Sequence, residues 1–188
     1  MTRILLIGNG AREHAIAEAI IKNSKIKLFS YMKAKNPGIA KLSKNIQIGN
    51  YDDLKEIRNF AKINNIDFAF IGPEEPLNAG VVDALNEINI NCIGPSKSLA
   101  RLETSKSFTR LLMKKYKIPG LPEFKVFESL EGVMEFIEEL DGVVVKPDGL
   151  TGGKGVKVQG DHFQTKEEAY KYCEEVLKEH KSVIVEEK

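Results

Sequence analysis

Residues 143–159 read Val-Val-Val-Lys-Pro-Asp-Gly-Leu-Thr-Gly-Gly-Lys-Gly-Val-Lys-Val-Gln. The segments 142–147 and 155–159 are short and rich in valine, a pattern that favours two β-strands over a strand followed by a helix. Four glycines lie at or beside the turn, and glycine lets backbone N–H groups come close to ligand oxygens. Lys146 and Lys154 add positive charge. The stretch therefore predicts a β-hairpin whose glycine-rich loop binds the polyphosphate of a nucleotide.

This loop does not fit the P-loop of nucleoside triphosphatases. That motif needs a lysine followed by Ser or Thr at the start of a helix, because the hydroxyl group holds magnesium. Here Lys154 is followed by Gly155. A flexible hairpin that closes over ATP is the interpretation we favour, and an ordinary glycine-rich turn with lysines for solubility is the alternative.

A second glycine motif lies near the N-terminus, where the apolar run Leu5-Leu6-Ile7 meets Gly8-Asn9-Gly10 and a helical pattern that starts near Arg12. The start of a helix offers free N–H groups and the positive end of the helix dipole, so this junction favours an anion. A dinucleotide site would need a third glycine near Glu13 and an acidic residue after the second strand. The second strand is instead followed by Lys33 and Lys35. NAD or FAD binding and a purely structural turn remain the weaker alternatives.

Composition narrows the class of protein. The chain has 188 residues, of which 42% are hydrophobic, and 28 basic against 27 acidic residues give a net charge of +1. Near-neutral charge argues against nucleic acid as the main partner. No apolar stretch is long enough for a membrane span and no leader is recognisable, so we expect a cytoplasmic protein. Cys92 and Cys173 lack metal or redox spacing and are expected to be reduced core residues.

The periodicity of apolar residues predicts an α/β protein of two domains. In the first, residues 1–117, strands alternate with helices as in a doubly wound, Rossmann-like parallel sheet. Its expected strands are 3–7, 27–31, 67–71 and 90–93, and its expected helices are 12–23, 53–64, 79–88 and 97–116. Residues 118–123 contain two prolines and a glycine and are expected to form a linker. Residues 118–188 form the second domain, with expected strands at 124–128, 143–147, 155–159 and 182–186 and helices at 130–140 and 166–180.

Three loops of the first domain are expected to converge, because open parallel sheets bind ligands at the carboxyl ends of their strands. They are the loops at 8–13, 36–38 and 72–75. Together they offer backbone amides, the guanidinium group of Arg12 and carboxylates for hydroxyl groups, which would suit a sugar phosphate. Taken singly, each Gly-Pro or Pro-Gly step could equally be simple turn chemistry.

Four motifs in one order along the chain resemble those of the phosphoribosylamine-glycine ligase family, also called glycinamide ribonucleotide synthetase, within the ATP-grasp superfamily. The motifs are Gly8-Asn9-Gly10 with Arg12-Glu13-His14, Gly72-Pro73-Glu74, Ser105-Lys106 with Phe108-Thr109, and Lys146-Pro147-Asp148-Gly149. The resemblance covers the whole chain and implies a pre-ATP-grasp domain followed by the first part of an ATP-grasp domain. It implies the ATP-dependent joining of glycine to 5-phosphoribosylamine in purine biosynthesis, through a glycyl phosphate.

The resemblance also implies roles for individual residues. Residues implied to bind ATP are Lys106, Lys146, Gly152, Gly153, Lys154, Gly155, Glu186, Glu187 and Lys188, the last three at an adenine-facing hinge. Residues implied to bind phosphoribosylamine are Gly8, Asn9, Gly10, Arg12, Glu13, Asn36, Pro37, Gly38, Gly72, Pro73 and Glu74. No catalytic acid or base is assigned.

Members of this family continue well beyond the point where this sequence stops. The resemblance implies Mg²⁺ or Mn²⁺ as a cofactor, with ligands in the missing part, and no metal site is expected in these residues. We therefore expect either a fragment of a longer ligase or a chain completed by a second polypeptide, and the 188 residues alone are expected to be inactive. A non-catalytic nucleotide-binding module and another ATP-grasp carboxylate-amine ligase are the alternatives.

Overall fold

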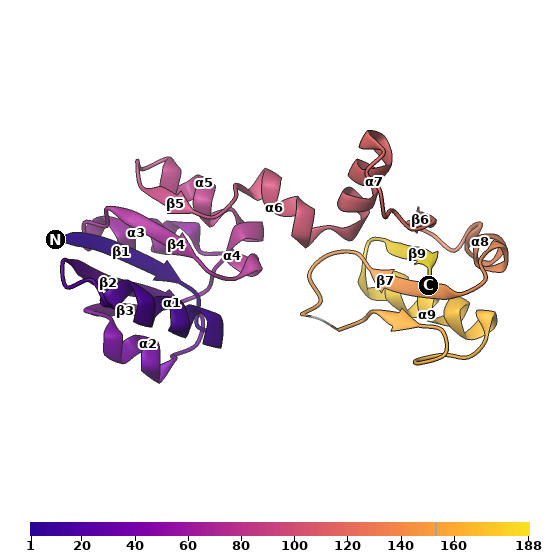
Figure 1. Ribbon diagram of the computed structural model, residues 1–188, viewed down its shortest axis with the longest axis horizontal. Helices are drawn as coiled ribbons and strands as arrows, with labels where there is room; N and C mark the ends of the chain where they lie inside the picture. The colour runs from indigo at the N-terminus through magenta and orange to yellow at the C-terminus, as the bar shows by residue number, and fades with distance from the viewer. Residues whose placement is uncertain (153) are drawn as a thin grey trace. The chain divides into compact units, whose positions relative to one another are not determined.

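The computed structural model describes residues 1–152 and 154–188, and the chain forms two compact units (Figure 1). The first unit comprises Met1–Ala100 and the second Arg101–Lys188. The sequence instead predicted a first domain that ends at residue 117. The difference arises because α7 (Lys106–Tyr116) makes its polar contacts with the second sheet, through Lys106 and Arg110.

The first unit is built on a five-stranded parallel sheet with strand order β3-β2-β1-β4-β5 (Figure 1). Its strands are β1 (Thr2–Ile7), β2 (Ile26–Met32), β3 (Asn45–Ile48), β4 (Phe68–Ile71) and β5 (Asn91–Ile93). Its helices are α1 (Ala11–Ile21), α2 (Pro37–Leu42), α3 (Leu54–Ile63), α4 (Glu74–Ala79) and α5 (Val81–Asn86), and α6 (Lys97–Thr104) spans the division between the units. The predicted doubly wound α/β class is confirmed.

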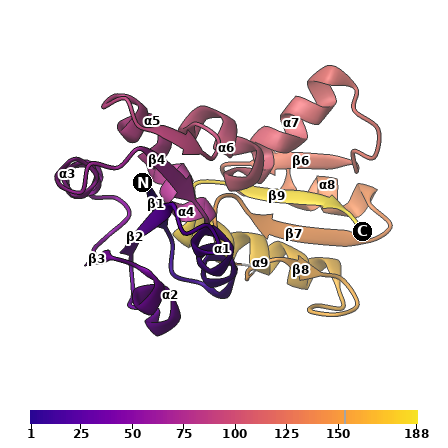
Figure 2. The same ribbon diagram turned by 60° about the vertical axis from the view of Figure 1, so that its left-hand side comes forward.

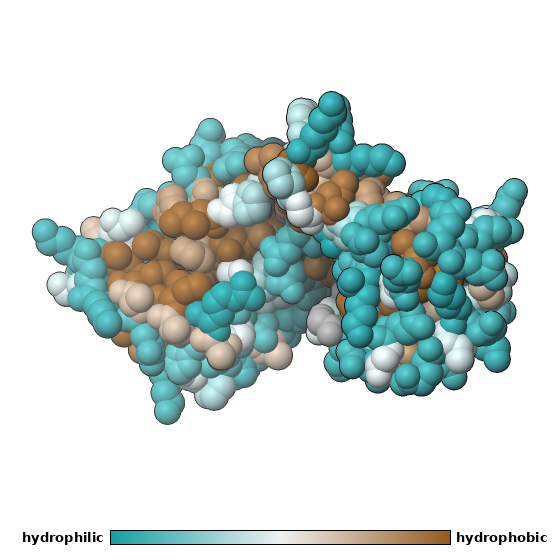
Figure 3. Space-filling model, turned by 45° about the vertical axis from the view of Figure 1, so that its right-hand side comes forward, coloured by the Kyte–Doolittle hydropathy of each residue, from teal (hydrophilic) through white to brown (hydrophobic). Residues whose placement is uncertain are grey.

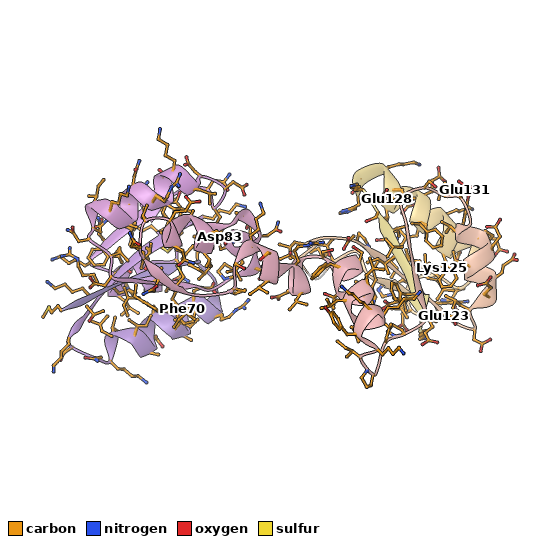
Figure 4. All side chains as sticks on the ribbon, turned by 90° about the horizontal axis from the view of Figure 1, so that it is seen from above. Phe70, Asp83, Glu123, Lys125, Glu128 and Glu131 are labelled. Atoms are coloured by element: carbon orange, nitrogen blue, oxygen red, sulfur yellow. The ribbon has the colours of Figure 1, made fainter. Side chains whose placement is uncertain are left out.

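The two faces of this sheet carry different apolar clusters. Leu5 and Ile7 of β1 belong to the larger cluster with residues of α3 and α5, whereas Leu6 belongs to a smaller cluster with residues of α1 and α2. On the face of the sheet that carries the smaller cluster, Phe70 is only partly buried and Ile93 is 49% exposed. Apolar side chains are accordingly visible on one face of this unit in Figure 3, and Figure 4 labels Phe70 on β4.

The second unit is a four-stranded antiparallel sheet with strand order β6-β9-β7-β8 (Figure 2). Its strands are β6 (Phe124–Phe127), β7 (Val143–Pro147), β8 (Lys157–Val158) and β9 (Val183–Glu187), and its helices besides α7 are α8 (Val133–Glu139) and α9 (Lys166–Glu179). Val144 pairs with Val158 and Val145 with Lys157, so the predicted antiparallel hairpin is confirmed. The second strand of the hairpin is shorter than the predicted 155–159.

Three local expectations were wrong. The expected helix 97–116 is divided, because Ser105 has an extended backbone and accepts a hydrogen bond from the Phe108 N–H as the N-cap of α7. The sequence interpretation missed α2 and β3, because it assigned Asn36-Pro37-Gly38 to a loop, whereas Asn36 is the N-cap of α2. Glu74 begins α4 rather than lying in a loop.

Candidate functional site

The strands of the second unit separate an apolar face from a charged one. Val143, Val145, Val183 and Val185 are buried with residues of α8 and α9 in one cluster. Side chains alternate between the faces of a strand, so Lys146 on β7 and Glu186 on β9 point to the opposite face. There α7 lies with Lys106 and Arg110. The charged face of this sheet is the candidate site.

Glu186 lies at the centre of the charged face. It is only 4% exposed, and its carboxylate accepts hydrogen bonds from Arg110 Nε at 2.9 Å and Arg110 Nη2 at 3.2 Å. Lys146 Nζ donates to Glu186 Oε1 of the same carboxylate. A buried carboxylate needs such partners, because burying an unpaired charge is costly. The sequence interpretation missed Arg110. Its spacing of four residues from Lys106 on one helix was an available signal, because residues at i and i+4 share a helix face.

Lys106 and Asp148 fix the beginning of the glycine-rich loop. Lys106 Nζ donates to the carbonyl oxygens of Pro147 at 3.1 Å and Gly149 at 2.8 Å, and burial lowers the pKa of this lysine. Burial by itself raises the pKa of Asp148. Hydrogen bonds that its carboxylate accepts from Ser107, Gly149 and Ser105 outweigh that effect, and the net pKa is lowered.

A cleft of about 250 Å³ opens beside these groups. Its lining residues are Leu102, Glu103, Lys106, Thr109, Arg110, Lys146 and Val156. Burial, together with the neighbouring charges of Arg110 and Lys106, lowers the pKa of Lys146 to about 8. Three cationic side chains around an apolar wall form a site that suits a polyphosphate attached to a planar base.

A second hollow, of about 370 Å³, lies against α9. Lys154 and Gly155 line it, and Tyr172 of α9 donates its hydroxyl hydrogen to the Gly155 carbonyl at 2.7 Å. The structure therefore does not place Lys154 among the residues that line the cationic cleft. Gly152 has a φ of 59°, in the region that favours glycine. Gly153 lies outside the described residues.

The last two residues are engaged within the sheet. Glu187 Oε1 accepts a hydrogen bond from the Glu123 N–H at 3.0 Å, and Lys188 Nζ donates to the Gln159 carbonyl at 2.9 Å. Neither Glu187 nor Lys188 lines the cationic cleft in the described part of the chain. Their contact with adenine therefore stays a prediction.

In the first unit the three predicted loops do come together. Asn36 Nδ2 donates to the Asn9 carbonyl at 3.1 Å, and Asn9 Oδ1 accepts from the Tyr51 hydroxyl at 2.7 Å. Asn36 Oδ1 also accepts from the N–H groups of Gly38 and Ile39 as the N-cap of α2, which begins at Pro37. Asn36 thus shapes the loops that meet here.

Glu13 is buried at the point where these loops meet and is 3% exposed. Its Oε2 accepts a hydrogen bond from the Gly10 N–H at 2.7 Å, and its Oε1 has no hydrogen-bond partner among the described residues. Gly8 and Gly72 lie so close that a Cβ on either would come within 2.4 Å of Glu13 Cγ. Pro73 closes the same corner, since its Cδ would lie 2.8 Å from that Cβ on Gly8. These glycines therefore provide room for Glu13.

Arg12 extends from this corner and remains largely exposed. Its Nε lies 3.6 Å from Glu13 Oε1, and its Nη2 lies 3.9 Å from Glu74 Oε2. The loose contacts leave the guanidinium group able to turn toward an anion, because exposed ion pairs at such distances contribute little. Lys33 and Glu75 form a further ion pair at this edge. The arrangement offers both cationic and carboxylate groups to a polar ligand.

The described residues contain no group of three or more His, Cys, Asp or Glu side chains that could hold a metal ion. None of the helices in residues 1–152 and 154–188 combines the length and apolar character needed to cross a bilayer.

The second unit belongs to the ATP-grasp class, as a match to a family model shows. The model of the ATP-grasp (A) domain of phosphoribosylglycinamide synthetase matches residues 104–188, and the model of the N domain of the same enzyme matches residues 2–103. The chain belongs to the phosphoribosylglycinamide synthetase family. The division between the two matches lies within α6, close to the division between the structural units.

Named relatives agree with this assignment. The chain is 51% identical over 180 residues to phosphoribosylamine-glycine ligase of Methanocaldococcus jannaschii, covering 93% of this chain and 40% of the relative. It is 48% identical over 176 residues to the Methanobrevibacter smithii ligase, with coverages of 93% and 40%. The crystal structure of phosphoribosylamine-glycine ligase from Thermotoga maritima matches all of this chain and 44% of its own, with a TM-score of 0.74 and 30% identity. The chain thus spans about 40% of the length of these curated relatives.

Proposed function

We propose that residues 1–188 carry the phosphoribosylamine site and the first part of the ATP site of a phosphoribosylamine-glycine ligase. The complete reaction joins glycine to 5-phosphoribosylamine and converts ATP to ADP and phosphate. The observation that carries the proposal is the cleft in which Lys106, Arg110 and Lys146 surround one hollow, in a chain of this family.

The chemistry explains why such a cleft is needed. A carboxylate does not acylate an amine unaided, so the γ-phosphoryl group of ATP first passes to a glycine carboxylate oxygen. The products are ADP and glycyl phosphate. The amine of phosphoribosylamine then attacks the glycyl carbonyl, phosphate leaves, and the nitrogen loses a proton. Both steps concentrate negative charge on phosphate oxygens, which fixed cations stabilise.

We assign the two substrates to the two units. Lys106 and Lys146 bind ATP phosphates, Gly152 to Gly155 follow as the covering loop, and residues 186–188 lie toward the base. In the first unit the loops that contain Gly8 to Glu13, Asn36 to Gly38 and Gly72 to Glu74 bind phosphoribosylamine. The convergence of these loops around Asn9 and Glu13 supports this part of the proposal.

Magnesium or manganese is expected for the complete enzyme. The described residues provide no cluster of His, Cys, Asp or Glu side chains for such a metal. The rest of the ATP site would come from further residues of the same polypeptide or from a second chain.

A chimera tests the proposed activity. Residues 1–188 would replace the matching part of the Methanocaldococcus jannaschii ligase, and ADP release would be measured with each substrate omitted in turn. We expect ADP only when glycine and phosphoribosylamine are both present. ADP release with bicarbonate or formate in place of glycine would assign the chain to another ATP-grasp ligase. A folded chimera that binds MgATP without turnover would favour the alternative of a non-catalytic nucleotide-binding module.

A further inference from the structure

Arg110 and Lys146 hold one carboxylate in two different ways. Arg110 reaches both oxygens of Glu186, from Nε to Oε2 at 2.9 Å and from Nη2 to Oε1 at 3.2 Å. Lys146 contacts only Oε1. A planar guanidinium fork matches a carboxylate with two parallel hydrogen bonds, whereas an ammonium group acts as a single point of charge. Arg110 is therefore the more firmly oriented of the two partners.

Lys146 is also one of the residues proposed to bind the phosphates of ATP. Lys146 lines the cleft together with Lys106 and Arg110. To bind a phosphate oxygen, its ammonium group must weaken or give up its contact with Glu186. Glu186 is almost fully buried, so a carboxylate left without any partner would carry a large desolvation cost.

We propose that Arg110 is a positioning residue that retains the Glu186 carboxylate while Lys146 is transferred to a phosphate of ATP. This inference rests on the proposed ATP site and goes beyond it, because it gives a role to a residue that need not touch the nucleotide. Without Arg110, Glu186 has Lys146 as its remaining cationic partner within the described residues. Lys146 then stays paired with Glu186 and cannot bind a phosphate of ATP.

A double-mutant cycle in the chimeric ligase tests the inference, with MgATP as the probe and its dissociation constant measured by calorimetry. Arg110→Met should weaken MgATP binding about tenfold or more, the range set by one charge-assisted contact. Glu186→Gln in the wild-type background sets the reference, because it reports any direct effect of this carboxylate on the nucleotide. In the Arg110→Met background, Glu186→Gln should restore most of the affinity, because a neutral amide no longer holds Lys146.

Net charge alone predicts a different result. If Arg110 and Glu186 acted on the nucleotide only through net charge, Glu186→Gln would change the affinity by the same factor in the wild-type and Arg110→Met backgrounds, so the two effects would add. Additive effects, or an Arg110→Met variant with unchanged affinity, would overturn the inference.

Lys115→Met is the matched control, because it removes one positive charge from an exposed position on the same helix. If Arg110→Met does not fold, Arg110→Lys keeps the charge, removes the fork and should show a smaller loss that Glu186→Gln again repairs.

The pH dependence gives a second readout. The charged groups that face Lys146 are Glu186 from β9, Lys106 and Arg110 from α7, and Glu103 of α6, which lines the same cleft. Arg110 lowers the pKa of Lys146, so Arg110→Met should raise that pKa and move the loss of MgATP affinity to higher pH. An unchanged pH profile would contradict the inference.

The outcome separates the inference from the proposed function. Lys146→Ala should weaken MgATP binding whatever Arg110 does. Weakened binding in Lys146→Ala with no coupling between Arg110 and Glu186 would overturn the inference and leave the ATP site standing. Unchanged binding in Lys146→Ala would overturn both.

Discussion

The backbone of Gly72, just after β4, lies directly against the buried side chain of Glu13. A Cβ at position 72 would come within 2.4 Å of Glu13 Cγ and 2.5 Å of Glu13 Oε1. Glu13 cannot simply swing aside, because it is enclosed and holds the Gly10 N–H. We expect Gly72→Ala to lower the free energy of unfolding by about 1 to 3 kcal/mol, as overpacking of a tight site does. Urea denaturation would measure the loss.

The cause of that loss can be isolated with a second substitution. Glu13→Ala removes the atoms that the new methyl group would strike. The combined variant should therefore lose less stability than the sum of the two single variants, since contacting residues are not additive. Full additivity would show that the overlap with Glu13 is not what destabilises Gly72→Ala.

Asp148 should make stability depend on pH in the acid range. Hydrogen bonds from Ser107, Gly149 and Ser105 outweigh burial and lower the pKa of its carboxyl group. A carboxyl group with a lowered pKa in the folded state stabilises the fold above its unfolded pKa, and this contribution is lost as pH falls through the folded pKa. Asp148→Asn should therefore destabilise the chain at pH 7, and the difference from wild type should narrow as pH falls below about 4. Asp161→Asn, at an exposed position in the same unit, should have nearly the wild-type stability both at pH 7 and below pH 4.

Lys146 should make ATP binding depend on pH in the basic range. Burial, with Arg110 and Lys106 nearby, lowers its pKa to about 8. The ammonium form is the one that attracts phosphate, so MgATP affinity should fall as pH rises through about 8. Lys146→Ala should already lose about 1.5 to 3 kcal/mol of binding free energy at pH 7 while the fold is retained.

Lys146→Arg provides the control for that pH effect, because a guanidinium group stays charged throughout this range. Its MgATP affinity, measured by calorimetry at pH 7 and pH 9, should be nearly constant. A wild-type affinity that is equally constant would mean that Lys146 does not titrate in this window or does not bind the phosphates.

The hairpin around residue 150 could be predicted from the sequence because its signals are local. Valines on both sides of the glycines predict two short strands, and Lys146 lies within the first of them. Local signals also mislead. Asn36-Pro37-Gly38 has the composition of a turn, yet the side chain of Asn36 caps a short helix, and a hydrogen bond from Asn36 Nδ2 to the Asn9 carbonyl fixes its place.

The pairing of Arg110 with Glu186 could not be predicted in the same way. The two residues are 76 positions apart, and only the tertiary structure brings α7 against β9. Spacing along α7 could suggest that Arg110 shares a face with Lys106, but it could not identify the carboxylate opposite. Similarly, the sequence shows Glu13 only as an acidic residue near the start of a helical pattern. Its burial depends on Gly8 and Gly72, which approach from two different loops.

Arg12 should affect the KM for phosphoribosylamine more than the KM for ATP. Its guanidinium group is 66% exposed and makes only loose contacts with Glu13 and Glu74, so Arg12→Ala should leave the fold intact. If it binds phosphoribosylamine, its loss removes a charge-assisted contact and should raise the KM for that substrate about tenfold or more, with a smaller change in the KM for ATP. The chimeric enzyme supplies both values, and Lys22→Ala, exposed at the other end of α1, is the control. An equal rise in both KM values would remove Arg12 from the phosphoribosylamine site.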